Sequence, residues 1–197
     1  MITLANKITL GRMLMVPFFI GSILSYTPVH DHFRYWALAI FLLAFVTDGI
    51  DGFVARRYHQ KTKLGEILDP LADKLLLISG FICLYQVGAD LPNVQIPFWL
   101  VAMIVIRDGV LLLGGLLMHF IYKILPRPST KLGKAATFFQ ALTVLSVLIQ
   151  WPGAIFLGYF AGIFTLASGF DYFMQGLQAI PVPFVKEVKV TKRGECS

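Results

Sequence analysis

The sequence predicts an all-α integral membrane protein with six transmembrane helices and a polar cavity open to the cytoplasm. Hydrophobic residues make up 57% of the 197 residues and charged residues only 14%, more apolar surface than a soluble domain of this length buries. Six apolar segments are each long enough to cross the hydrocarbon core of a bilayer as a helix. Basic residues also gather in alternate connections between these segments, as they do in membrane proteins.

Short stretches typical of turns separate the apolar segments: TPVHD, KTKLG, DLPNVQIP, LPRPST and WPG. We expect the six spans at 8–27, 35–57, 66–88, 95–121, 133–151 and 154–178. The first segment follows Lys7 and resembles a signal peptide, but no small-residue cleavage site follows it and further spans do. We therefore expect one membrane domain over 1–180 and a basic cytoplasmic tail over 181–197.

The basic residues fix the expected orientation. They lie before the first span, after the sixth, and in the second and fourth connections, whereas Arg34 is the one Lys or Arg in the other three. Because cytoplasmic loops carry the excess of Lys and Arg, both termini should be cytoplasmic, in a bacterial inner (cell) membrane. The tail should lie against anionic headgroups. The net charge of +6 is thus explained by topology, and no nucleic-acid partner is expected.

Four aspartates lie where the second predicted span ends and the third begins. Helical spacing gathers them with small residues on two faces that can oppose each other: Asp48, Asp51, Gly52 and Ala55 on one, and Gly65, Asp69 and Asp73 on the other. Carboxylates inside a bilayer are costly and usually functional. A structural alternative is that they cap helices and pair with Arg56, Arg57 and Lys74, and Asp69 before Pro70 has the form of an N-cap.

Four carboxylates on facing helices repel one another unless cations neutralise them. Oxygen ligands without paired His or Cys favour Mg²⁺ or Mn²⁺. Two such ions balance four charges and suit phosphoryl chemistry. The small residues Gly52, Ala55 and Gly65 leave room for a bulky ligand, although such residues also suit close packing of helices. Arg56, at the mouth of the expected site, can hold a phosphate.

The hairpin has the pattern Asp48-x2-Asp51-Gly52-x2-Ala55-Arg56-x8-Gly65-x3-Asp69-x3-Asp73, which resembles the signature of the CDP-alcohol phosphatidyltransferase family at every fixed position. The resemblance implies a homodimeric membrane enzyme that moves a phosphatidyl group from a CDP-lipid to an alcohol and releases CMP. It implies metal ligands at Asp48, Asp51, Asp69 and Asp73, with Asp73 also the base. It implies CDP-lipid contacts at Gly52, Ala55, Arg56, Thr62 and Gly65.

The opening NKITLGR places Asn6, Thr9 and Arg12 three apart, on one side of an expected interfacial helix. It resembles the opening of phosphatidylglycerophosphate synthases within that family, where the segment lies near the nucleotide. We therefore add Asn6 and Thr9 to the expected CDP-lipid contacts. An ordinary amphipathic anchor is the alternative.

The acceptor alcohol depends on basic residues farther along the chain. Arg107 lies inside an apolar run and should meet either Asp108 or an acceptor phosphate. Lys134, with Lys131 one turn before it, lies in an LGK and T-x-x-Q pattern that resembles the acceptor-phosphate pocket of phosphatidylglycerophosphate synthases, although topology alone also explains a basic loop. These residues favour glycerol 3-phosphate as the acceptor.

Three alternatives remain. One is another CDP-alcohol phosphatidyltransferase, with inositol phosphate, serine or a choline-type alcohol as the acceptor. Phosphatidylglycerophosphate synthases often have Arg-Glu where this chain has Arg107-Asp108, and a further arginine that is missing here; an Arg-Asp pair resembles cardiolipin synthases, which use phosphatidylglycerol. A divalent-cation carrier is the alternative of another class, disfavoured because all four aspartates lie at one membrane face and Arg56 does not help a cation path. Near the end of the sixth span, Ser168, Asp171 and Tyr172 are expected to bond within the bundle rather than reach the site.

Overall fold

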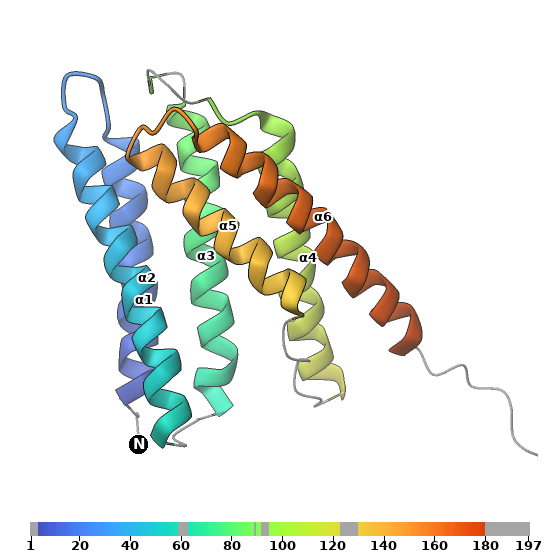
Figure 1. The fold of residues 1–197 in the computed structure, drawn as a ribbon. Coiled ribbons are helices and arrows are strands. Elements are labelled where there is room, and N and C mark those ends of the chain that lie inside the picture. The colour runs from blue at the N-terminus through green and yellow to red at the C-terminus, as the bar shows by residue number, and fades with distance from the viewer. Residues whose placement is uncertain (1–3, 59–62, 89, 92–94, 123–129, 180–197) are drawn as a thin grey trace, which may run out of the picture.

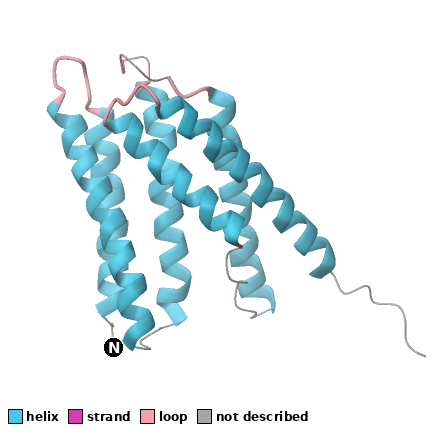
Figure 2. Cartoon of the chain, viewed as in Figure 1, coloured by secondary structure: helices cyan, strands magenta, loops and turns pink. Residues whose placement is uncertain are grey.

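The computed structural model describes residues 4–58, 63–88, 90–91, 95–122 and 130–179, and the side chains of 10–47, 71–88, 90–91, 95–115, 130–172 and 174. Within these residues the chain forms six helices and no strand, which confirms the predicted all-α fold (Figure 2). The helices are α1 (Leu4–Leu24), α2 (His32–Tyr58), α3 (Lys63–Val87), α4 (Phe98–Tyr122), α5 (Lys131–Leu148) and α6 (Ala154–Ala179).

Successive helices run in opposite directions, so α1, α3 and α5 begin at the end of the bundle where α2, α4 and α6 finish (Figure 1). α1 packs along both α2 and α3, and α5 packs along α6 while it also touches α2 and α3. α5 and α6 slant across the other helices (Figure 1). This arrangement brings the end of α2, the start of α3 and the start of α5 to one end of the molecule.

Four helices begin earlier than the sequence predicts, α1, α2, α3 and α5, and the early starts of α1 and α3 each change an interpretation. α1 starts at Leu4 and continues through Arg12 without a break, so Asn6, Thr9 and Arg12 belong to a long helix rather than to a separate interfacial one. α3 starts at Lys63, so Asp69 lies inside the helix and its interpretation as an N-cap is wrong. A proline near a helix start, such as Pro70, removes a single backbone hydrogen bond, and membrane helices tolerate that loss.

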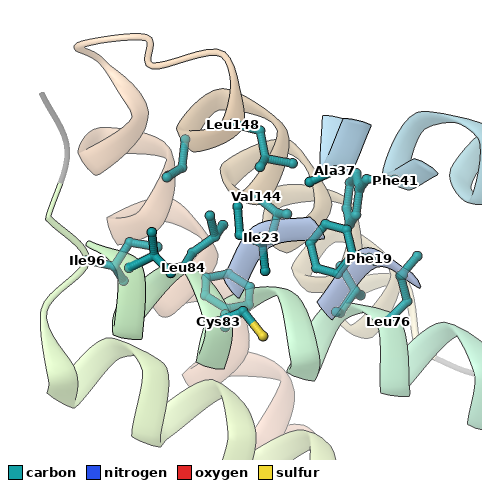
Figure 3. Close-up of a cluster of buried hydrophobic side chains, with 14 of the residues drawn as sticks. Phe19, Ile23, Ala37, Phe41, Leu76, Cys83, Leu84, Ile96, Val144 and Leu148 are labelled. Atoms are coloured by element: carbon teal, nitrogen blue, oxygen red, sulfur yellow. The ribbon is translucent and has the colours of Figure 1, made fainter. Parts of the chain in front are cut away.

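Apolar side chains fill the upper part of the bundle. Phe19 and Ile23 of α1 meet Phe41 of α2, Leu84 of α3 and Val144 of α5, all of them fully or almost fully buried (Figure 3). Large apolar side chains also point outward on most helices, Phe18, Trp36, Leu113, Phe138 and Phe170 among them. Several polar side chains are buried instead: Arg12, Arg34, Asp108, Gln140, Thr143, Ser146, Thr165 and Ser168. Apolar outside and partly polar inside is the distribution expected of a bundle surrounded by lipid.

Two stretches of the described residues are long and apolar enough to cross a membrane, Phe98–Gly115 in α4 and Ala154–Tyr172 in α6. α1 and α2 contribute shorter apolar stretches, Leu10–Leu24 and His32–Thr47. The six helices are therefore observed, whereas six membrane crossings stay a prediction.

Arg34 holds the α1–α2 connection to the end of α5. Its guanidinium donates to both carboxylate oxygens of Asp31, at 2.7 and 2.8 Å, and to the carbonyl oxygen of Leu148, at 2.7 Å. Leu148 is the last residue of α5, so the arginine satisfies a backbone carbonyl that the helix leaves free. The hydrogen bond from Arg34 lowers the pKa of Asp31 below its usual value.

Candidate active site

A cavity of about 370 Å³ lies between α2, α3 and α5. Its lining residues are Phe45 of α2, Asp73 and Lys74 of α3, and Gly133, Lys134, Thr137 and Phe138 of α5. Asp73, the predicted base, and Lys134, the predicted acceptor lysine, thus line the same cavity although they are far apart in the chain. One carboxylate and one ammonium group from α3 and a second ammonium group from α5 therefore line the same cavity.

Asp73 pairs with Arg12 of α1, whose Nη1 donates to Oδ1 of the carboxylate. The arginine side chain is 2% exposed, whereas that of Asp73 is 33% exposed. The ion pair fixes the carboxylate at the cavity wall and leaves part of it open to a ligand. The ion pair also shows that Arg12 faces the interior of the bundle. If the start of α1 were only an amphipathic anchor at the membrane surface, Arg12 would not need to face inward.

A second polar cluster lies behind the cavity and is centred on Asp108 of α4, which is completely buried. Its Oδ1 accepts a hydrogen bond from Nη1 of Arg107, and its Oδ2 lies 3.0 Å from Nζ of Lys74. Lys74 also donates to Oγ1 of Thr137 on α5, at 3.3 Å. The cluster therefore connects α3, α4 and α5 directly behind the wall that carries Lys74.

α6 completes this cluster. Nη2 of Arg107 donates to Oγ of Ser168, and the guanidinium lies 5.9 Å from the ring centroid of Tyr172. Arg107 was predicted to meet either Asp108 or an acceptor phosphate, and the structure shows the contact with Asp108. Ser168 bonds within the bundle, as the sequence predicts.

The start of α5 is organised by Thr130, whose Oγ1 accepts a hydrogen bond from the backbone N–H of Gly133 at 3.1 Å. This N-cap starts the helix so that Gly133, Lys134 and Thr137 reach the cavity. A Cβ on Gly133 would lie 3.4 Å from Oγ of Ser168 on α6, an ordinary van der Waals distance, so α6 lies directly beside this turn of α5. Lys131 is exposed on the first turn and does not line the cavity.

Three of the four predicted metal ligands, Asp48, Asp51 and Asp69, lie in helical backbone, and their side chains fall outside the described set. The same holds for the predicted CDP-lipid contacts Asn6, Thr9, Gly52, Ala55, Arg56 and Gly65, while Thr62 lies outside the described residues altogether. Among the described side chains, no three His, Cys, Asp or Glu residues gather, since Asp73 alone of the four belongs to that set. The continuous helices do preserve the spacing on which the two aspartate faces depend.

The sequence did not point to a role for Lys74 or Asp108 at the site. Lys74 directly follows Asp73 and Asp108 directly follows Arg107, and helical spacing alone gives neither of them a contact at the site. The available signal was the pair of opposite charges inside the apolar run MIVIRDGVLLL, because a buried carboxylate requires partners. Nothing in the chain indicated that the second partner would come from α3.

The fold and the cavity define a class: a helical bundle with an apolar exterior, and an acidic and basic pocket suited to phosphate chemistry at one end. Comparison with known proteins agrees, because the family model of CDP-alcohol phosphatidyltransferase matches residues 2–170. The chain belongs to the CDP-alcohol phosphatidyltransferase family and is thus a phosphatidyltransferase enzyme. The family is membrane-associated and uses divalent cations.

Several curated relatives resemble most of the chain. It is 32% identical to a probable phosphatidylglycerophosphate synthase of Mycobacterium tuberculosis, over 90% of this chain and 83% of the relative. It is also 32% identical to a CDP-diacylglycerol–glycerol-3-phosphate 3-phosphatidyltransferase of Bacillus subtilis, over 91% of this chain and 98% of the relative. A cardiolipin synthase (CMP-forming) of Streptomyces coelicolor is 32% identical over 83% of this chain and 72% of the relative.

Proposed function

We propose that this protein transfers the phosphatidyl group of CDP-diacylglycerol to glycerol 3-phosphate, giving phosphatidylglycerophosphate and CMP in phospholipid biosynthesis. The observation that carries the proposal is the cavity in which Asp73 lies beside Lys74 and Lys134. A carboxylate suits the acceptor hydroxyl, and the lysines suit its phosphate. Relatives of similar length named for this reaction support the same acceptor.

Asp73 acts as the general base. It takes the proton of the acceptor hydroxyl, and the resulting oxygen attacks the phosphorus that carries the diacylglycerol. A new phosphorus–oxygen bond forms to the acceptor, the bond from that phosphorus to the CMP oxygen breaks, and CMP leaves with the electron pair. Arg12 holds the carboxylate at the cavity wall during this step, and Lys134 holds the acceptor phosphate. We assign Lys131, which is exposed on the first turn of α5, to attracting the acceptor phosphate toward the cavity.

The residues present fit divalent cations. Asp73 offers carboxylate oxygens at the cavity, Asp69 precedes it by four residues in the same helix, and Asp48 and Asp51 lie on the final helical turns of α2. We assign these four aspartates to two ions, Mg²⁺ or Mn²⁺, which prefer oxygen ligands. When bound, such ions supply positive charge that stabilises the transferring phosphate and the departing CMP.

The donor lipid occupies the end of the bundle formed by α1, α2 and the start of α3. We assign its CDP part to residues of these three segments and of the connection between α2 and α3: Asn6, Thr9, Gly52, Ala55, Arg56, Thr62 and Gly65. The apolar side chains Phe45 and Phe138 at the cavity give the diacylglycerol part an apolar border. With the CDP part and the diacylglycerol part placed in this way, the nucleotide and the water-soluble acceptor stay near the cytosol while the acyl chains remain in lipid.

All six helices cross the membrane in this proposal, with both termini in the cytoplasm, and the enzyme acts as a homodimer in the bacterial inner membrane. The outward-facing apolar side chains and the alternation of basic connections support six crossings. The cavity then opens on the cytoplasmic side, where glycerol 3-phosphate and CMP are found.

A second candidate is cardiolipin synthesis with phosphatidylglycerol as the acceptor. The Arg107–Asp108 pair and the similarity to the cardiolipin synthase of Streptomyces coelicolor favour it. The two lysines at the cavity favour the phosphomonoester, which carries more charge than a phosphodiester.

The test is CMP release by purified protein in detergent with CDP-diacylglycerol, Mg²⁺ or Mn²⁺, and one acceptor at a time. We expect release with glycerol 3-phosphate and none above background with phosphatidylglycerol. Release with phosphatidylglycerol alone would establish the cardiolipin reaction instead. No release with either acceptor, or with a panel of other alcohols, would contradict the proposed enzyme.

A further inference from the structure

We propose that Lys74 is a further binding residue for the acceptor phosphate, and that Asp108 is a positioning residue that holds Lys74 at the cavity wall. The inference rests on the proposed function, because it names the residue that completes the pocket for a phosphorylated acceptor. It also gives Arg107 a supporting role behind the cavity instead of direct contact with the acceptor.

The charges of the buried cluster are not balanced. One carboxylate, that of Asp108, lies between the ammonium of Lys74 and the guanidinium of Arg107, and all three side chains are mostly or fully buried. Among these three side chains one positive charge is left over, and in an apolar bundle an uncompensated charge is expensive. An anion that enters the cavity and reaches Lys74 would compensate it.

Lys74 rather than Arg107 is placed to meet that anion. Both terminal nitrogens of Arg107 already donate, to Asp108 and to Ser168, and Arg107 does not line the cavity. Lys74 does line it, with a side chain that is 17% exposed. An ammonium group has three N–H donors; among the described residues Nζ of Lys74 donates to Thr137 and forms an ion pair with Asp108, which leaves at least one donor for a ligand.

The position of Lys74 also matches the chemistry of the acceptor. It follows Asp73 directly in α3, and Lys134 contributes to the same cavity from α5. We infer that the acceptor phosphate lies between the two lysines. Its hydroxyl can then reach Asp73 only when a few bonds separate the hydroxyl from the phosphate. A small phosphorylated alcohol meets this condition.

The first experiment separates the two Michaelis constants in Lys74→Met. The KM for glycerol 3-phosphate should rise about 10- to 100-fold, as for loss of one hydrogen bond to a charged group, while the KM for CDP-diacylglycerol changes less than about twofold. Lys74→Gln, which keeps a donor for Thr137 but not the charge, should behave similarly. Arg34→Met is the matched control, since it removes another buried, Asp-paired cation at the opposite end; it should lower Tm and leave both KM values unchanged.

Asp108 is tested by the double variant Lys74→Met/Asp108→Asn. If Asp108 acts through Lys74, Asp108→Asn alone should raise the KM for glycerol 3-phosphate, and the double variant should be no worse than Lys74→Met. If the fold increases in the KM for glycerol 3-phosphate of the two single variants multiply in the double variant, Asp108 has a separate role and the positioning assignment is overturned.

A binding measurement without turnover distinguishes the possible failures. Glycerol 3-phosphate, added without CDP-diacylglycerol, should raise Tm of the wild type and of Arg34→Met but not of Lys74→Met or Lys74→Gln. A wild type that neither binds nor uses glycerol 3-phosphate would sink the proposed function. A wild type that uses it, with folded Lys74 variants that keep a normal KM and a normal Tm shift, would overturn this inference alone.

Discussion

At the scale of the residue, Asp73 is held by a buried arginine while its own carboxylate remains accessible from the cavity. Its partner Arg12 is almost completely buried, while the carboxylate itself remains partly exposed at the cavity. A purely structural ion pair would not need that exposure, and a freely solvated carboxylate would not need a buried arginine. The arrangement suits a base that must be fixed in place and still reach a substrate.

We predict that Asp73→Asn lowers kcat by about 10²- to 10⁴-fold, the usual contribution of a general base, or by more if metal binding is also lost. Asparagine keeps the shape of the side chain but cannot accept the proton. CMP release with CDP-diacylglycerol and glycerol 3-phosphate measures the effect. Asp31→Asn, the same change at the opposite end of the bundle, is the control and should retain wild-type kcat; an Asp73→Asn enzyme of normal activity would exclude Asp73 as the base.

The Asp31–Arg34 pair predicts a pH dependence of stability. Because the pKa of Asp31 is lowered in the folded protein, its ionised form stabilises the fold above the unfolded-state pKa of about 3.9, and this contribution is lost as the pH falls through the lower folded-state value. Asp31→Asn should therefore reduce Tm by roughly 1–4 °C near neutral pH, because the Asp31 side chain is 41% exposed although Arg34 is buried. The difference from wild type should shrink when the melts are repeated below about pH 3. A difference that is constant with pH would contradict the assignment.

At the scale of the element, the contact between α4 and α6 depends on small residues. Cβ atoms added at Gly158 and Gly162 would lie 3.2 and 3.0 Å from the side chain of Leu100, which is completely buried on α4. The two glycines are four residues apart, so they form one shallow face of α6 that accepts this leucine. The same two helices carry Arg107 and Ser168 farther along, so their spacing sets the geometry of the buried cluster.

We predict that Gly162→Leu destabilises the protein by about 1–3 kcal/mol through overpacking, which corresponds to a loss of roughly 2–10 °C in Tm. Thermal unfolding in detergent measures it. Gly21→Leu on α1 is the matched control, because a Cβ at Gly21 has nothing within 4 Å. Equal melting temperatures for the two variants would show that α4 and α6 do not pack as described.

The helices could be predicted from sequence because each depends on a long local apolar run, and all six were found. Their starts were less accurate where a local signal was ambiguous: Asp69–Pro70 has the form of a helix start, although α3 begins six residues earlier. Of the site, the sequence indicated Asp73 and Lys134, because each belongs to a recognisable spacing. It did not indicate the contacts Arg12–Asp73 and Lys74–Asp108, since these join residues distant in the chain and depend on how three helices pack.

At the scale of the whole molecule, the cavity lies between the middle of α2 and α3 and the first two turns of α5, and α5 begins at the same end of the bundle as α1 and α3. The basic connections lie at this end, and the contacts of Arg34 with Asp31 and Leu148 lie at the other. If the positive-inside rule holds, the cavity opens toward the cytosol and the Arg34 contacts lie on the outer side. The proposed catalytic residues then lie nearer the cytoplasmic side, and the contacts that join α2 to α5 lie on the other side.

Labelling of introduced cysteines tests this orientation. Val29→Cys, at a position that is 85% exposed in the α1–α2 connection, should react with a membrane-impermeant thiol reagent in intact cells. Thr130→Cys, in the α4–α5 connection, should react only after the membrane is opened. Both variants are made in a Cys196→Ser background, and Cys83 is buried. The reverse pattern of labelling would mean that the bundle is inserted the other way round.

We propose that the cavity lined by Asp73 and Lys134 selects a small phosphorylated alcohol as the acceptor. The most direct measurement is a competition: purified protein receives CDP-diacylglycerol with equal concentrations of glycerol 3-phosphate and phosphatidylglycerol, and mass spectrometry quantifies the lipid products. We predict phosphatidylglycerophosphate as the dominant product in the wild type, and loss of that product in Asp73→Asn. Cardiolipin as the dominant product would contradict the claim, because the acceptor would then be a lipid that enters from the bilayer.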